Sequence, residues 1–294
     1  MRTAISTLEV VRPKRLDDAL GALARAGERR LTPIAGATDL LVYLNAGTGE
    51  YARFLDLLGL RELRGVRVRR DAVTLGALTT FREIRDHEVL RRRFPSLVAA
   101  AAEVGAWQIQ ARATLGGNIA NASPAGDSLP VLMAHDAVIH ARSAAGARDL
   151  PMAQFYRGYR TLELRPDELI VAITLPFAPP RAKTFFRKVG TRRAQSISKV
   201  VFSGVLVPAR DGTIADARLA WGSVAPVTMR SRGAEAALVG AKPSRSVAAR
   251  AREALDADIA PIDDIRSDRE YRRTIAGNVL EQFLRASDPR FTRG

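Results

Sequence analysis

The spacing of apolar residues near the start of the chain switches between the periods of a helix and of a strand. Leu20 and Leu23 share one face at helical spacing, whereas short apolar runs without that period are typical of strands. The pattern predicts a helix over 17–26, a strand over 32–35, a helix over 39–45 and a strand over 54–58. Thr38 or Asp39 is placed to cap the second helix, and Gly47 follows its end. We therefore expect a small βαβ-like unit.

The next stretch, to residue 176, mixes both periods. Apolar and polar residues alternate between 66 and 78, which predicts strands. Thr80 followed three residues later by Glu83 is the pattern of a capping box, so a helix is expected to begin there. The other expected elements are a helix over 95–106, a polar loop over 114–127, a helix over 128–134, and strands over 137–141 and 169–175.

A proline-rich break at 176–180 is the expected domain boundary. Beyond it, Asp211 and Gly212 form a turn signal between two alternating runs, which predicts a hairpin. The expected elements there are strands over 200–207 and 217–222 and helices over 230–238, 246–255 and 269–284. The fold class is therefore α+β. We expect a first domain over 1–176, with subdomains of about 1–58 and 59–176, and a second domain over 177–294.

The chain has 294 residues and a formal net charge of +15, most of it from arginine because only five lysines occur. The basic residues are spread along the chain in small groups at 29–30, 91–93, 192–193 and 272–273. Aromatic residues make up 6% and are not interleaved with these groups, as a surface for stacking bases would require. The charge is interpreted as an arginine-rich surface or as a match for acidic partners, with nucleic-acid binding as a further alternative.

The sequence contains no cysteine, which excludes disulfides and cysteine-ligated zinc or iron–sulfur clusters on this chain. Its three histidines do not form a ligand cluster, so no metal site is expected. The longest apolar stretch, 97–107, is interrupted by Glu103 and is too short for a membrane span. With no secretion signal visible, a cytoplasmic protein is expected.

Two segments carry candidate chemistry, and the first joins a predicted strand to a predicted helix. Small side chains at its turn let backbone amides approach an anion, and a helix N-terminus adds unpaired amides. This suits a pyrophosphate, although an ordinary capped turn would have the same pattern. The segment consists of Pro33, Ile34, Ala35, Gly36, Ala37, Thr38, Asp39 and Leu40.

The second segment is the polar, glycine-rich stretch over 114–127, read as a loop of unusual length. Long loops are more often functional, but a plain polar surface loop is the alternative. Adjacent glycines free the backbone, and Asp127 offers a carboxylate for ribose hydroxyls. Its candidate ligand-binding residues are Thr114, Leu115, Gly116, Gly117, Asn118, Asn121 and Asp127. Neither segment matches a Rossmann fingerprint or a P-loop, so a nucleotide site here must use another fold.

Together the two segments, A-G-A-T-D-L-L at 35–41 and A-T-L-G-G-N-I-A-N-A-S-P-A-G-D at 113–127, resemble the FAD-binding subunits of molybdenum hydroxylases. That family includes the medium subunits of aerobic carbon monoxide dehydrogenase and bacterial xanthine dehydrogenase. F-R-K-V-G-T-R-R-A-Q-S-I at 186–197, G-S-V-A-P at 222–226 and Y-R-R at 271–273 add to the resemblance.

The resemblance implies a two-part FAD-binding domain of the vanillyl-alcohol-oxidase/PCMH type, followed by a C-terminal small antiparallel sheet plus helices. Residues 33–40 would hold the pyrophosphate through backbone amides and 114–118 would form a second cradle. Asp127 would contact the ribose or ribityl region, and Ile170 and Lys188 fall at later flavin contacts.

The chain departs from the family pattern at two positions. Val104 stands where some members place an aromatic residue near the adenine, and valine cannot stack. Ala37 stands where a second glycine is common. A methyl group is tolerated at that position only if the backbone angle φ is negative.

In the family scheme, a large molybdopterin subunit oxidises the substrate, and a small [2Fe–2S] subunit passes electrons to the FAD, which reduces NAD, a quinone or oxygen. The resemblance thus implies an oxidoreductase subunit with no catalytic side chains of its own, in a dimer of heterotrimers. The alternatives are a stand-alone flavin oxidoreductase, which would purify without partners, and a basic nucleic-acid-binding protein, which would bind no flavin.

Overall fold

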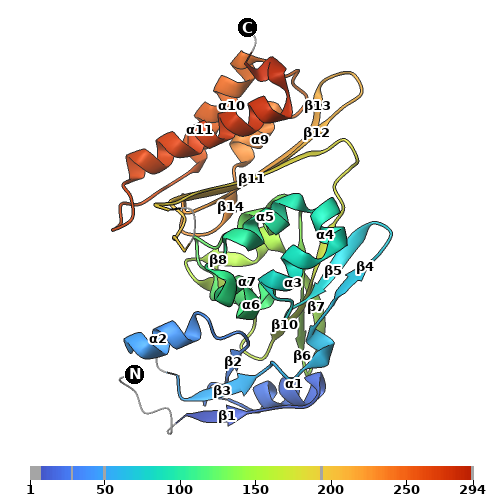
Figure 1. The fold of residues 1–294 in the computed structure, drawn as a ribbon, viewed down its shortest axis with the longest axis vertical. Helices are drawn as coiled ribbons and strands as arrows, with labels where there is room; N and C mark the ends of the chain where they lie inside the picture. Colours follow the sequence, from blue (N-terminus) through green and yellow to red (C-terminus); the bar gives the residue numbers. More distant parts are fainter. Residues whose placement is uncertain (1–7, 28, 49–50, 193–194, 293–294) are drawn as a thin grey trace.

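The computed structural model describes residues 8–27, 29–48, 51–192 and 195–292. Figure 1 shows three units stacked along the long axis, each built on its own sheet. The N-terminal unit lies at one end, the helix-rich middle unit follows, and the C-terminal unit lies at the other end. Within the described part of the chain, no helix has both the length and the apolar character needed to cross a membrane.

The first unit is a parallel sheet of three strands in the order β1-β3-β2. Its elements are β1 (Glu9–Val11), α1 (Leu16–Ala24), β2 (Thr32–Ile34), α2 (Leu40–Ala46) and β3 (Arg53–Asp56). Leu20 and Leu23 of α1 are buried against Leu55 of β3, which confirms the helical face predicted from their spacing. The predicted βαβ-like unit is therefore present, with β1 as an additional strand.

The middle unit is an antiparallel five-stranded sheet in the order β4-β5-β10-β6-β7. Its strands are β4 (Val66–Val68), β5 (Ala72–Gly76), β6 (Val138–Ser143), β7 (Gly146–Pro151) and β10 (Leu169–Pro176), with a separate hairpin of β8 (Tyr156–Gly158) and β9 (Thr161–Leu162). Six helices between β5 and β6 pack beside it: α3 (Phe81–Asp86), α4 (Glu88–Arg93), α5 (Pro95–Glu103), α6 (Trp107–Arg112), α7 (Leu115–Asn121) and α8 (Leu129–Ala134). The capping box between Thr80 and Glu83 is confirmed.

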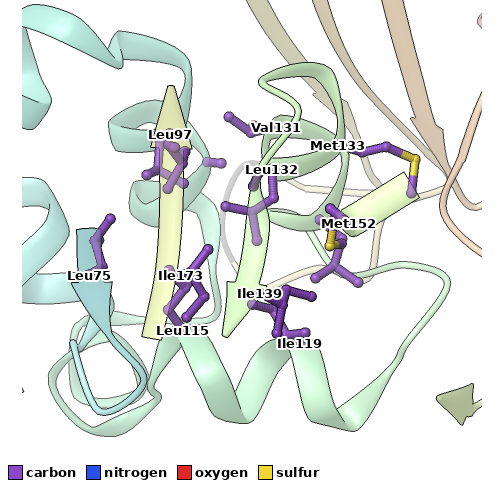
Figure 2. Close-up of a cluster of buried hydrophobic side chains, with 14 of the residues drawn as sticks. Leu75, Leu97, Leu115, Ile119, Val131, Leu132, Met133, Ile139, Met152 and Ile173 are labelled. Carbon is purple, nitrogen blue, oxygen red and sulfur yellow. The ribbon is translucent and has the colours of Figure 1, made fainter. Parts of the chain in front are cut away.

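The expectation of one long loop over 114–127 is wrong, because its first half is the helix α7. Leu115 and Ile119 lie four residues apart on one face and are fully buried. Figure 2 shows them beside Ile173 of β10 and Ile139 of β6, in the main hydrophobic core. Burial of this face outweighs the low helix propensity of the two glycines between them.

The C-terminal unit is an antiparallel sheet in the order β11-β12-β13-β14, covered on one side by helices. Its elements are β11 (Lys183–Val189), β12 (Val200–Pro208), β13 (Ile214–Gly222), β14 (Met229–Arg230), α9 (Arg232–Leu238), α10 (Arg245–Asp258) and α11 (Arg269–Ser287). Phe202 lies at the centre of its core, with ring centroids 4.3 Å from Trp221 and 5.4 Å from Phe283. Gly212, with φ of 84°, occupies the predicted turn between β12 and β13.

Candidate functional site

At Gly36 the first segment meets the backbone that directly precedes the second segment. A Cβ atom at this position would lie 2.0 Å from the carbonyl oxygen of Arg112, the last residue of α6, and 3.1 Å from Cα of Ala113. Only glycine permits this approach, because any side chain would force the two backbones apart. The segment 33–40 is thereby held against the start of the second segment, more than 70 residues later in the chain.

The backbone amides of the first segment are available to a ligand. None of the amides of residues 35–39 donates a hydrogen bond to any other residue that the structure describes. Hydrogen bonding resumes at Leu41, whose amide donates to the carbonyl of Ala37 over 3.0 Å. Half-buried backbone amides normally have partners, so a run of five without one marks a place where water or an anionic ligand supplies the acceptors.

Ala37 lies in the left-handed region, with φ of 62°. The expectation that a methyl group here requires a negative φ is therefore wrong. The conformation costs about 1–2 kcal/mol for a residue with a Cβ atom, and the packing of the segment at Gly36 holds the backbone in it.

The second segment differs from the first, since its amides are already used. Those of Leu115 and Gly116 donate to the carbonyls of Thr79 and Ala77, each over 2.9 Å. The amide of Gly117 donates to the Thr114 hydroxyl over 3.1 Å, and that of Asn118 to the Thr114 carbonyl over 2.9 Å. Four successive amides are thus committed to capping and anchoring α7. Any contact of residues 114–118 with a ligand would come from their surface and side chains.

Asp127 lies at the far end of the second segment in a buried ion pair. Its Oδ2 accepts a hydrogen bond from Nζ of Lys188 over 2.7 Å, and the two side chains are 10% and 4% exposed. Lys188 also donates to the carbonyl of Glu103 over 3.1 Å. Burial raises the pKa of Asp127 to about 7, although Lys188 acts to lower it. Oδ1 of Asp127 is buried and has no hydrogen-bond partner among the described residues, so it can accept from a bound hydroxyl.

The C-terminal unit holds the segment that carries Asp127 at two further points. The hydroxyl of Ser198 donates to the carbonyl of Ala125 over 3.0 Å, and the amide of Ser223 donates to that of Pro124 over 2.8 Å. Arg272 holds the backbone at or next to each donor, because its Nη1 donates to the carbonyls of Lys199 and Ser223. Arg193 and Ala194, in the stretch that resembles the family, lie outside the described residues.

The sequence did not predict a polar cluster that connects α2, α7 and the turn between β8 and β9. The hydroxyl of Tyr43 on α2 donates to Oδ1 of Asn121 over 3.2 Å and accepts from Nη2 of Arg160 over 2.9 Å. Asn121 also lies near the carboxylate of Asp39 and acts on its pKa. Partial burial raises the pKa of Asp39, and Arg160 and Asn121 oppose that rise. The signal in the sequence was the run Gly158-Tyr159-Arg160, which places an arginine in a tight turn.

Ile170 and Val104 do not join these polar groups. The Ile170 side chain is 7% exposed and belongs to the main core, beside an irregularity in the pairing of β10 with β6. Val104, at the end of α5, is half-buried and packs against the same core. Two cavities, of about 230 Å³ near Thr228 and about 510 Å³ between α10 and α11, are lined by neither of the two segments. Within the described residues, no three potential ligands converge to hold a metal ion.

The fold and these segments define a nucleotide-binding α+β protein that lacks both the Rossmann fingerprint and the P-loop. Residues 6–178 match the family described as the FAD binding domain in molybdopterin dehydrogenase. Residues 185–287 match the CO dehydrogenase flavoprotein C-terminal domain. The chain therefore belongs to the family of FAD-binding flavoprotein subunits of molybdopterin dehydrogenases.

Individual relatives agree over nearly the whole chain. The xanthine dehydrogenase FAD-binding subunit of Escherichia coli O157:H7 is 30% identical over 280 residues, which cover 92% of this chain and 94% of that protein. The carbon monoxide dehydrogenase medium chain of Hydrogenophaga pseudoflava is 26% identical over 276 residues, covering 94% and 95%. A solved structure of carbon monoxide dehydrogenase from the same organism superposes with a TM-score of 0.91, covering 96% of this chain and 98% of that one. The resemblance stated from the sequence is confirmed.

Proposed function

We propose that this chain holds one FAD and passes electrons through it, as a subunit of a cytoplasmic molybdenum hydroxylase. In this proposal, a large molybdopterin subunit oxidises the substrate and a small subunit carries [2Fe–2S] clusters. This chain would hold the FAD, from which electrons would leave to an external acceptor such as NAD or a quinone. The chain has no cysteine, so cysteine-ligated clusters must lie on another chain.

The main support for the flavin proposal is the run of amides over 35–39, which donate to no other residue in the described part of the chain. These amides lie where Gly36 contacts the second segment, which suits the pyrophosphate of FAD. We propose that Pro33, Ile34, Thr38 and Leu40 complete this contact, with Ala35, Gly36, Ala37 and Asp39. In this arrangement the segment 114–118 supplies the opposite wall, and Asn121 fixes the position of the first segment.

The buried oxygen of Asp127 fits the sugar part of the cofactor. Oδ1 lacks a donor among the described residues, and a ribose or ribityl hydroxyl would supply one. Lys188 neutralises the carboxylate and keeps it oriented through Oδ2. Ile170 would contribute through its backbone at the irregular pairing of β10, since its side chain is buried in the core.

The proposal divides the chain at the proline-rich break, with a FAD-binding domain over 1–176 and a C-terminal flavoprotein domain over 177–294. The flavin supplies acceptance and release of electrons in one- and two-electron steps. The protein's residues bind and orient it, and the buried ion pair with Lys188 holds the Asp127 carboxylate in place.

The first experiment is to purify the full chain, record its absorption spectrum, and identify the chromophore released by heat. We expect FAD at about one per chain, or uptake of added FAD by the flavin-free protein. The variant Lys188→Met should bind FAD more weakly, because it leaves Asp127 without its cation. Lys183→Met, at an exposed position on the same strand, is the matched control. A folded protein that takes up no FAD refutes the proposal.

A further inference from the structure

The helix α2 has no fully buried residue and lacks a buried apolar face. None of its seven residues is buried, and Leu41 and Val42 are 52% and 59% exposed. Helices of this length are not stable alone and normally depend on a buried apolar face. The position of α2, and of the 35–39 segment that leads into it, must therefore depend on other contacts.

Side-chain contacts supply that support, and two of them are consecutive hydrogen bonds that share the Tyr43 hydroxyl. Nη2 of Arg160 donates to the Tyr43 hydroxyl over 2.9 Å, and that hydroxyl donates to Oδ1 of Asn121 over 3.2 Å. The guanidinium also lies 5.3 Å from the ring centroid of Tyr43 and 5.8 Å from that of Tyr159. Arg160 thus contacts α2 through a hydrogen bond to the Tyr43 hydroxyl and through a cation–π contact with the Tyr43 ring. Asn121 connects the same hydroxyl to α7.

The backbone at Arg160 is itself constrained. Its φ is 52°, in the left-handed region that a residue with a Cβ atom rarely adopts. The hairpin of β8 and β9 holds it there, since Gly158 pairs with Thr161 on either side of the turn. Residues held in such backbone conformations are concentrated at functional sites.

We propose that Arg160 is a positioning residue for the cofactor: through Tyr43 it fixes α2 against α7 and so presents the unpaired amides of residues 35–39. This inference rests on the proposed flavin function. Arg160 does not need to touch the FAD. Its positive charge lies close enough to Asp39 to act on that carboxylate at the end of the same segment.

The test compares FAD binding by the full-length chain and three variants. Arg160→Met removes the hydrogen bond and the charge, Tyr43→Phe keeps the ring and removes the hydroxyl, and Arg160→Lys keeps the charge. We expect the FAD dissociation constant, from quenching of flavin fluorescence, to rise about tenfold for Arg160→Met. Tyr43→Phe should weaken binding less, and Arg160→Lys should restore part of the affinity.

Two further measurements separate positioning from general stability. The melting temperature of flavin-free Arg160→Met should equal that of the wild type, because α2 buries no residue. The effects of Arg160→Met and Tyr43→Phe should be less than additive, because both remove the hydrogen bond between Arg160 and the Tyr43 hydroxyl. Arg157→Met is the matched control: it lies on β8 but pairs with Glu163, and its FAD affinity should not change.

The outcomes distinguish this inference from the proposed function. Wild-type affinity in Arg160→Met would overturn the inference while leaving the flavin proposal intact. A loss of affinity accompanied by an equivalent loss of melting temperature would also overturn it, because Arg160 would then be a general structural residue. A wild-type chain that binds no FAD would overturn the proposed function, and this inference with it.

Discussion

Gly36→Ala tests whether the contact between the two segments builds the cofactor site. The new Cβ atom would lie 2.0 Å from the carbonyl oxygen of Arg112 and 2.7 Å from its carbonyl carbon. An ordinary contact of this kind is about 3.3 Å long, so the backbones must separate by more than about 1 Å. The obstructing atoms belong to the backbone and cannot rotate away.

Overpacking of this type costs about 1–3 kcal/mol. If the flavin-free protein relaxes and FAD binding must restore the close approach, the dissociation constant for FAD rises by about 5- to 140-fold. If the contact is kept, the same energy is lost from the free energy of unfolding instead. Flavin fluorescence titration and urea unfolding of the flavin-free protein measure the two quantities.

Gly59→Ala is the matched control, because its Cβ would lie 3.9 Å from the nearest atom outside its own neighbourhood, the carbonyl oxygen of Pro13. We expect it to change neither quantity. If Gly36→Ala also leaves both affinity and stability at wild-type values, the two segments do not meet as the structure has them, and the argument for the cradle is refuted.

Three other substitutions test separate parts of the structure. Ala37→Gly should raise the free energy of unfolding by about 0.5–1 kcal/mol in a urea titration, because glycine relieves the positive φ, whereas Ala35→Gly should lower it. Burial lowers the pKa of His135 to about 4, so on acidification the unfolded chain binds this proton before the folded chain does. The free energy of unfolding should therefore fall by about 3 kcal/mol between pH 6.5 and pH 4. The same fall in His135→Gln would contradict this. Arg272→Met should lower the melting temperature and cost about 3 kcal/mol, because it leaves the carbonyls of Lys199 and Ser223 unpaired, while Arg269→Met, at an exposed position on the same helix, should cost under about 1 kcal/mol.

Local signals in the sequence were sufficient for much of the fold. The capping box at Thr80 and Glu83 depends on residues three apart, and the turn at Gly212 depends on two adjacent residues. The helix α7 was missed because its glycines argue for a loop, each costing about 1 kcal/mol in a helix. Gly116 is there because a Cβ would lie 2.8 Å from Ala77, a close approach that only the folded structure reveals.

The residues of the candidate site stay a prediction from the sequence, and their geometry could not be predicted. Family resemblance selected both Asp127 and Lys188, yet their ion pair joins positions 61 residues apart on different units. Tyr43, Asn121 and Arg160 are separated by 78 and 117 residues, so the turn signal around Arg160 could not show that the three side chains meet. The sequence also could not show that the amides of 35–39 are unpaired whereas those of 115–118 are committed, because that depends on where the neighbouring carbonyls lie.

The hydrogen bonds from the C-terminal unit to Pro124, Ala125 and Asp127 have a consequence for biosynthesis. The donors are Lys188, Ser198 and Ser223, all of which are translated well after the segment they hold. A nascent chain that has completed its first 176 residues therefore still lacks what fixes this segment. If the proposed site holds the FAD, it can take its final form only after about three quarters of the polypeptide has left the ribosome, and a prematurely terminated product should be colourless.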